Sequence, residues 1–179
     1  MTCVVSYDAP VGRYYLFGDE KGLTGIWLEG QKYFPKEKWA EPLGFWENEV
    51  LVQTQFWLDR YFAGECPAPQ ELPLYPEGSP FQQRIWQVLL EIPYGSVTTY
   101  GAIAKQVGKE LGKETLSPQA VGGAVSHNPI SIVIPCHRVV GANGTLTGYA
   151  GGVEVKQWLL KHEGVKVEPE EQFHGMEGR

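Results

Sequence analysis

Five prolines fall within the fifteen residues from Cys66 to Pro80, and this density limits the folds that the chain can adopt. Proline fixes φ at roughly −65° and has no N–H, so this segment can neither continue a helix nor fill the middle of a sheet. Proline-rich segments form stiff, extended spacers instead. We therefore predict an N-terminal domain over residues 1–78, a second domain over 79–164 and an acidic, loose tail over 165–179.

The residues before this boundary predict a small antiparallel sheet and one helix. Apolar or alternating runs at 3–8, 12–18 and 23–29 are separated by turn residues, which is the pattern of a β-meander. Apolar residues then recur at helical spacing over 47–62.

The residues after the boundary predict a mostly helical domain. Ser79, Pro80 and Gln82 form a strong helix start, because serine caps the first turn, proline suits its first position and glutamine completes a capping box. Trp86, which follows in this helix, is expected to pack in the core.

Two short helices, over 99–107 and 118–126 with a polar connection at 108–115, indicate a helix-turn-helix. A last helix is predicted over 153–162, with Gly164 as its stop. The expected fold class is α+β.

The composition is that of an ordinary globular protein, with 42% hydrophobic and 20% charged residues in 179. No apolar run approaches the length of a membrane span, and the N-terminus lacks a signal-peptide pattern. Three widely spaced cysteines, at positions 3, 66 and 136, do not suit a disulfide framework. We expect a cytoplasmic protein without a membrane partner.

One of these cysteines lies in the run Ile132–Val140, between a proline and a histidine–arginine pair. The apolar part of the run predicts a strand that ends at Pro135. The thiolate is the nucleophilic form of cysteine, and neighbouring positive charge lowers the thiol pKa. The run therefore indicates a reactive Cys136; the alternative is a buried structural cysteine at a strand end.

The sequence Pro135-Cys136-His137-Arg138-Val139 resembles the active-site signature of the O6-alkylguanine-DNA alkyltransferases, also called methylated-DNA–protein-cysteine methyltransferases. Other motifs resemble the same family in the same order: Ile92-Pro93-Tyr94-Gly95, Thr99-Tyr100-Gly101, Ala120-Val121-Gly122-Gly123-Ala124, Asn128-Pro129, Gly148-Tyr149-Ala150-Gly151-Gly152 with Lys156, and Leu159 to Gly164. The likeness covers roughly residues 80–164. It implies a helix-turn-helix and an active-site loop in the C-terminal domain.

The resemblance implies single-turnover repair of alkylated DNA. The thiolate of Cys136 attacks the alkyl carbon on O6 of guanine, with O4-alkylthymine as a further candidate substrate. His137 acts as the base through a bridging water, Glu163 orients His137, and Asn128 ties the recognition helix to the active-site loop. The thioether product cannot be opened by water under mild conditions, so each protein molecule reacts once. No cofactor is expected.

The expected partner is double-stranded DNA containing O6-alkylguanine, bound by a monomer. Because the reacting atom is buried in the duplex, the base must be flipped out. The residues implied to bind the flipped base are Tyr100, Val139, Tyr149, Ala150 and Gly151. The residues implied to contact DNA, through the minor groove, are Thr99, Tyr100, Gly101, Gln119, Ala120, Gly123 and Ala142.

The distribution of charge along the chain limits the strength of DNA binding that we expect. Residues 1–79 carry six basic and twelve acidic side chains, whereas residues 80–163 carry seven basic and five acidic ones, a net charge of +2. Phosphate contacts by Lys and Arg dominate nonspecific DNA affinity. We therefore expect modest, salt-sensitive binding that relies on backbone N–H groups and a helix N-terminus.

Two departures from the family pattern stand out. Gln119 replaces the arginine that fills the space left by the flipped base in the best-known members. Asp19 and Thr24 occupy two positions where some members have zinc ligands, and Cys3 is alone, so we expect no metal.

Several alternatives stay open. Glu163 is a solvated residue in one interpretation, Asn128 is a simple turn residue, and Gly122 and Gly123 permit tight helix–helix packing. At the level of the whole protein, the alternatives are a DNA-binding regulator or lesion flag that performs no chemistry, and a cysteine hydrolase. Alkylation of Cys136 by a damaged oligonucleotide separates the alkyltransferase from a pure DNA binder, and turnover of an ester or amide would mark the hydrolase.

Overall fold

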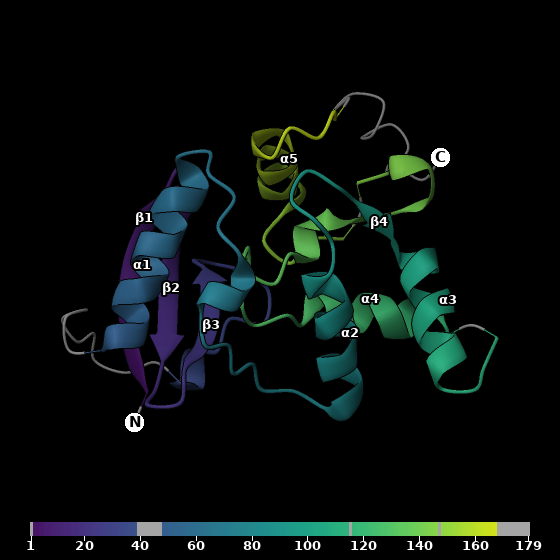
Figure 1. Ribbon diagram of the computed structural model, residues 1–179, viewed down its shortest axis with the longest axis horizontal. Helices are drawn as coiled ribbons and strands as arrows, with labels where there is room; N and C mark the ends of the chain where they lie inside the picture. The colour runs from purple at the N-terminus through teal and green to yellow at the C-terminus, as the bar shows by residue number, and fades with distance from the viewer. Residues whose placement is uncertain (1, 39–47, 115, 147, 168–179) are drawn as a thin grey trace. The chain divides into compact units, whose positions relative to one another are not determined.

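The computed structural model describes residues 2–38, 48–114, 116–146 and 148–167 (Figure 1). The chain forms two compact units. Unit 1 comprises Met1–Glu77 with Pro129–Val133, and unit 2 comprises Gly78–Asn128 with Ile134–Arg179. The helices and strands confirm the predicted α+β class, and the domain limits at 78 and 164 stay predictions.

Unit 1 is built on a three-stranded antiparallel sheet with β2 (Gly12–Gly18) between β1 (Cys3–Ala9) and β3 (Leu23–Leu28). The sheet is largely apolar, and the side chains of Val4, Leu16 and Ile26 are fully buried. These strands lie where the β-meander was predicted.

Helix α1 (Glu49–Phe62) packs against this sheet in unit 1. It begins at Asn48, whose side-chain oxygen accepts a hydrogen bond from the N–H of Leu51 at 3.0 Å. Its buried face includes Thr54, which the predicted apolar stripe left out. The Thr54 hydroxyl donates to the carbonyl of Val50 at 2.8 Å, so the helix itself satisfies this buried polar group.

The proline-rich segment is extended except for a 3₁₀ turn at Pro69–Glu71, and residues 66–77 pack as part of unit 1. The N–H of Leu23 donates to the carbonyl of Pro73 at 2.7 Å, and the N–H of Tyr75 donates to the carbonyl of Leu23 at 2.8 Å. Further along the same strand, the N–H of Ile26 donates to Pro129 at 2.9 Å. Two segments distant in sequence thus form parallel bridges to β3, which local patterns do not reveal.

The described residues of unit 2 form four α-helices: α2 (Pro80–Leu90), α3 (Tyr100–Glu110), α4 (Pro118–Ser126) and α5 (Val153–His162). The predicted capping box at Ser79 and Gln82 is present. Trp86 is buried, as predicted, and its indole N–H donates to the carbonyl of Ala124 at 2.8 Å. This bond joins α2 to the second helix of the helix-turn-helix.

A short parallel pair joins the helix-turn-helix to the cysteine motif. Strand β4 (Thr98–Thr99) immediately precedes α3, and it pairs with β5 (Val139–Val140), which immediately follows Arg138. Tyr100 and Cys136, 36 positions apart in sequence, are thereby positioned from one small piece of sheet.

Three local predictions are wrong. Helix α3 continues through Gly108 to Glu110, because Gly108 is buried and Glu110 pairs with Arg84 of α2 at 2.7 Å. Residues 132–134 form turns rather than a strand; Ile132 has φ of 72°, which a strand cannot contain.

The third concerns the start of the tail, which was expected to be loose. Val165 and Val167 pack against the buried cluster of Val140, Leu146 and Leu160. The remainder of the predicted tail, 168–179, lies outside the described residues, as do Glu47 and His174. Within the described part of the chain, no helix is long and apolar enough to cross a membrane.

Candidate active site

Cys136 opens a 3₁₀ turn, Cys136–Arg138, directly after Pro135. Its side chain is 7% exposed, and its N–H donates to the carbonyl of Ile134 at 2.8 Å. The same carbonyl accepts a hydrogen bond from Nδ2 of Asn128 at 2.7 Å. Asn128, buried just after α4, therefore fixes the backbone that precedes the cysteine.

His137 and Glu163 form a buried pair beside this turn. Nε2 of His137 lies 2.6 Å from Oε2 of Glu163, and neither side chain has any exposed surface. Glu163 is the residue that caps the end of α5. A solvated Glu163, one of the alternatives left open by the sequence, is therefore excluded.

Arg138 faces Glu163 rather than the thiol. Its Nε donates to Oε1 of Glu163 at 2.8 Å, and its Nη2 donates to Oε2 at 3.1 Å. The N–H of Gly95 adds a longer bond to Oε1, at 3.4 Å. The interpretation of Arg138 as a charge that acts directly on Cys136 is wrong: the guanidinium is committed to the carboxylate.

Burial and these bonds set the ionisation of the pair. Burial lowers the pKa of His137 below its ordinary value, although Glu163 opposes the shift. Burial acts to raise the pKa of Glu163, but hydrogen bonds from His137 and Arg138 outweigh it and hold this pKa well below its usual range. At neutral pH the pair is therefore a carboxylate and a neutral imidazole.

The tautomer follows from this assignment. A neutral imidazole bonded to a carboxylate places its proton on Nε2, which leaves the lone pair on Nδ1. Nδ1 of His137 is buried and has no hydrogen-bond partner within the described residues. The imidazole thus presents an acceptor that the protein itself leaves unused.

The thiol of Cys136 does not have the low pKa that the sequence predicted. Burial raises it, while Asn128, Lys156 and Tyr149 act in the opposite direction. In the free protein the protonated thiol is the stable form, so a base is needed for reaction.

Lys156, which the sequence interpretation placed in a motif but gave no role, is a further candidate site residue. This side chain on α5 is fully buried, and Nζ lies 5.9 Å from the ring centroid of Tyr100 and 6.0 Å from that of Tyr149. Burial lowers the pKa of Lys156 to about 8. The spacing to Leu159 and Leu160, three and four residues on, places a lysine on the buried face of an amphipathic helix, and that signal was available.

The remaining residues predicted to bind the base lie in two places. Val139 is fully buried on β5, where it pairs with Thr98. Tyr149, Ala150 and Gly151 are half-buried in the turn before α5. Lys156 brings the first of these turn residues, Tyr149, near Tyr100.

The residues predicted to contact DNA lie at the starts of α3 and α4 and in a nearby turn. The Thr99 hydroxyl caps α3 by accepting from the N–H of Ala102 at 3.0 Å, and Gly101 is exposed in its first turn. Gln119 and Ala120 are exposed in the first turn of α4. Ala142 is also exposed, in the 3₁₀ turn Ala142–Gly144.

The glycines of α4 are not explained by internal packing. A Cβ atom built on Gly122 or on Gly123 would meet no atom within 4 Å. The alternative that these glycines permit close helix–helix packing is therefore wrong. Their bare backbone faces open space.

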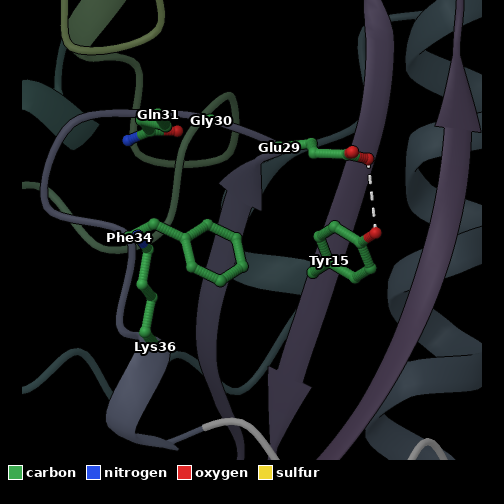
Figure 2. A pocket seen from close by; sticks show the side chains of 6 residues that line it. All are labelled: Tyr15, Glu29, Gly30, Gln31, Phe34 and Lys36. Carbon is green, nitrogen blue, oxygen red and sulfur yellow. Dashed lines mark hydrogen bonds between the residues drawn. The ribbon is translucent and has the colours of Figure 1, made fainter.

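A cavity of about 360 Å³ lies in unit 1 (Figure 2). Its lining residues are Tyr15, Glu29, Gly30, Gln31, Phe34 and Lys36. The Tyr15 hydroxyl donates to Glu29 at 3.3 Å, and the side-chain oxygen of Gln31 accepts from the N–H of Leu28 at 3.0 Å. None of the predicted site residues lines this cavity. Among the described residues, no group of three or more His, Cys, Asp and Glu side chains is placed to hold a metal.

Comparison with known proteins agrees with the geometry of unit 2. Residues 80–165 match the model of the 6-O-methylguanine DNA methyltransferase DNA binding domain, and residues 4–76 match that of the ribonuclease-like domain. The methylated-DNA–protein-cysteine methyltransferase of Haemophilus influenzae is 43% identical over 157 residues, which cover 88% of this chain and 83% of that protein. The protein of the same name from Methanosarcina acetivorans is 42% identical over 160 residues, which cover 88% of this chain and 96% of that protein.

Solved structures show the same likeness. The Mycobacterium tuberculosis O6-methylguanine methyltransferase matches with a TM-score of 0.76 and 38% identity, covering 94% of this chain and 96% of that one. The M. tuberculosis OGT in complex with DNA matches with a TM-score of 0.75 and 39% identity, and the match covers 88% of this chain and 90% of that one.

A helix-turn-helix unit with a buried cysteine, histidine and carboxylate defines a DNA-binding protein with a cysteine nucleophile. The chain belongs to the 6-O-methylguanine DNA methyltransferase family, whose members are DNA-repair proteins that transfer an alkyl group from DNA to cysteine. The predicted family, its reaction and DNA as the partner are confirmed.

Proposed function

We propose that this chain repairs O6-alkylguanine in double-stranded DNA by moving the alkyl group to Sγ of Cys136. The observation that carries this assignment is the unused Nδ1 of a neutral, buried His137 whose other nitrogen is bonded to Glu163. This is the arrangement of a general base held in one tautomer by a carboxylate.

The proton leaves the thiol first. Because Cys136 and His137 are adjacent in a tight turn, a bridging water is the natural link between Sγ and Nδ1. His137 becomes an imidazolium, which Glu163 stabilises through Nε2. The thiolate then attacks the alkyl carbon: an S–C bond forms, the C–O6 bond breaks, and the guanine leaves with the electron pair and takes up a proton.

Lys156 supplies positive charge where negative charge develops. Its ammonium lies about 6 Å from the rings of Tyr100 and Tyr149 in unit 2, and it opposes the rise in the pKa of Cys136 that burial causes. A fixed charge in a buried site stabilises a thiolate more strongly than the same charge in water. The product is a thioether without a leaving group that water can displace, so the reaction is stoichiometric.

The bare backbone of α4 supports a close approach to DNA. Gly122 and Gly123 offer no side chain, and Gln119 is exposed at the start of the same helix. We assign α4 to the minor groove, with Gln119 entering the space left by the flipped guanine. Tyr100 and Tyr149 receive the base.

Reaction with a duplex that contains O6-methylguanine tests the proposal. Intact-mass analysis should show one added methyl group per protein, and peptide mapping should place it on Cys136, with Cys3 and Cys66 unmodified. Cys136→Ser should remove no methyl. A Cys136→Ser protein that still repairs the duplex, or turnover beyond one equivalent, would refute the mechanism, whereas binding without added mass would identify a lesion flag.

The state and location of the protein are part of the same proposal. All three cysteines are free, which suits a reducing, cytoplasmic compartment. We assign the active form as a monomer, since the proposed site is built within unit 2 of one chain. Light scattering on the DNA complex checks this.

A further inference from the structure

The side chain of Arg138 is held from three sides by groups other than the thiol. Two of its nitrogens donate to the carboxylate of Glu163. Nη1 donates to the carbonyl of Ile92 at 2.7 Å, and the ring of Tyr94 lies 5.7 Å from the guanidinium carbon. A guanidinium fixed in this way presents a permanent positive charge in one position.

This charge balances the buried set. Arg138 and Glu163 carry opposite charges and are 9% and 0% exposed, so together they are neutral while His137 is uncharged. Protonation of His137 would add a net positive charge to a region shielded from water, which is costly. Without Arg138, the His137–Glu163 pair by itself would carry a net negative charge until it takes up a proton.

We propose that Arg138 is a positioning residue that keeps His137 neutral, and therefore able to accept the thiol proton, at physiological pH. The consequence for activity, which is the loss of His137 as the general base, rests on the proposed function. Its physical core, the coupling between Arg138 and His137, can be measured without any reaction.

The titratable and charged groups around His137 come from its own turn and from the region of α5. Cys136 and Arg138 come from its own turn, and Lys156 and Glu163 come from α5 and its cap. Lys156 acts on the pKa of His137 in the same direction as Arg138, and Glu163 acts in the opposite direction. The pKa of Lys156 is about 8, so this lysine is mostly charged below about pH 7, and titrations between about pH 5 and 7 isolate the effect of Arg138.

The decisive measurement is the NMR titration of ¹³C-labelled histidine in the free protein, comparing wild type with Arg138→Gln. The His137 signal is assigned by its absence from His137→Phe. A charge within about 4–6 Å shifts a pKa by about 1–3 units, so the midpoint of the pair should rise by at least about one unit. The pH profile of methyl transfer should move to higher pH by the same amount, so that the rate falls on the acid side and recovers as the pH rises.

Three further proteins make the comparison sharp. Arg138→Lys retains the charge, so His137 should stay neutral at pH 6.5. Arg138→Gln combined with Glu163→Gln removes both charges, so the His137 midpoint should fall again. Arg84→Gln breaks another arginine–glutamate pair of unit 2, with Glu110, and should leave the titration unchanged.

Two results would overturn the inference: a folded Arg138→Gln protein whose His137 titrates as in wild type, or a rate reduced by the same factor at every pH. The second would make Arg138 a structural support only. If Arg138→Gln does not fold, Arg138→Lys provides the test, because a protonated His137 at pH 6.5 in that variant would also refute the inference. Failure of wild type to transfer a methyl group would refute the proposed function, while the titration still tests Arg138.

Discussion

Both units bury polar side chains, but the kinds differ. Among the described residues, those of unit 1 are Gln31, Thr54 and Ser131, all uncharged, whereas those of unit 2 are Asn128, His137, Arg138, Lys156 and Glu163. In unit 1, Gln31 and Thr54 bond to backbone groups within four residues, which completes a turn and a helix. In unit 2, His137 and Arg138 bond to Glu163, more than twenty residues away.

This difference distinguishes polar side chains that are buried as part of the fold from charged side chains that are buried for the proposed reaction. Unit 1 can be stabilised by apolar burial, and its few buried polar groups satisfy themselves locally. Removing a charge from water costs several kcal/mol, and well-packed apolar residues often replace a buried ion pair without loss of stability. Unit 2 nevertheless concentrates such charges around Cys136, which is where the proposed reaction needs a base and an electrostatic field.

The largest effect is expected when Glu163→Gln is compared with Leu16→Ala of the β2 core. Glu163→Gln leaves Arg138 buried beside a neutral amide, which should lower the free energy of unfolding by about 3–5 kcal/mol. Leu16→Ala opens a cavity at a fully buried site and should cost about 2–5 kcal/mol.

Urea denaturation measures both losses, and methyl-transfer rates per folded molecule separate the two variants. Only Glu163→Gln should slow the chemistry, because it removes the group that holds His137. Equal slowing by Leu16→Ala would mean that the proposed division between the units is wrong.

Lys156→Met is predicted to change stability and activity in opposite directions. Because the pKa of Lys156 falls from 10.5 to about 8 on folding, the charged side chain costs at most about 3 kcal/mol at pH 7. Methionine should recover part of this cost and slow alkyl transfer, since the charge near Cys136 is lost. A variant that is less stable and equally active would contradict both assignments.

The pH dependence gives a second test of Lys156. Between pH 8 and 10.5 the unfolded chain binds the lysine proton and the folded chain releases it, so this group makes wild type more stable as the pH rises. Denaturation at pH 7 and pH 10 should show the difference between wild type and Lys156→Met shrinking. A constant difference would show that the lysine is not buried as a charge.

Much of the fold could be predicted because local chemistry specifies it. The capping box at Ser79 fixes the start of α2, and the turn residues between the first three runs fix the meander. The strand predicted before Cys136 was wrong. A continuous apolar segment is typical of a buried strand, but the positive φ of Ile132 turns the chain there. No local pattern could place Pro129–Val133 against β3, since that pairing joins distant segments.

Some features of the candidate site could also be predicted from the sequence, and others could not. The resemblance supplied His137 and Glu163, which the structure brings together. The direction in which Arg138 points could not be read from adjacency to Cys136, because a tight turn sends neighbouring side chains to different partners. The raised pKa of Cys136 reflects its burial, a tertiary property that the flanking residues do not reveal.

The smallest effect on stability, and the clearest on binding, is expected from Gly123→Ala in α4. Alanine is a better helix former than glycine by about 0.5–1 kcal/mol, and no atom lies within 4 Å of the added Cβ, so thermal denaturation should show a more stable protein. If α4 lies close in the minor groove, the same methyl group meets DNA. Duplex affinity should then fall by roughly tenfold, which corresponds to about 1.4 kcal/mol.

Reaction with free O6-benzylguanine provides the control for Gly123→Ala, because this small substrate reaches Cys136 without approach of a duplex. Its rate should match that of wild type, while repair of a duplex containing O6-methylguanine slows at protein concentrations below saturation. The combination of higher stability, weaker DNA binding and normal reaction with the free base has no explanation in internal packing. Wild-type duplex affinity in the more stable variant would place α4 away from the groove, and the open glycines would then need another cause.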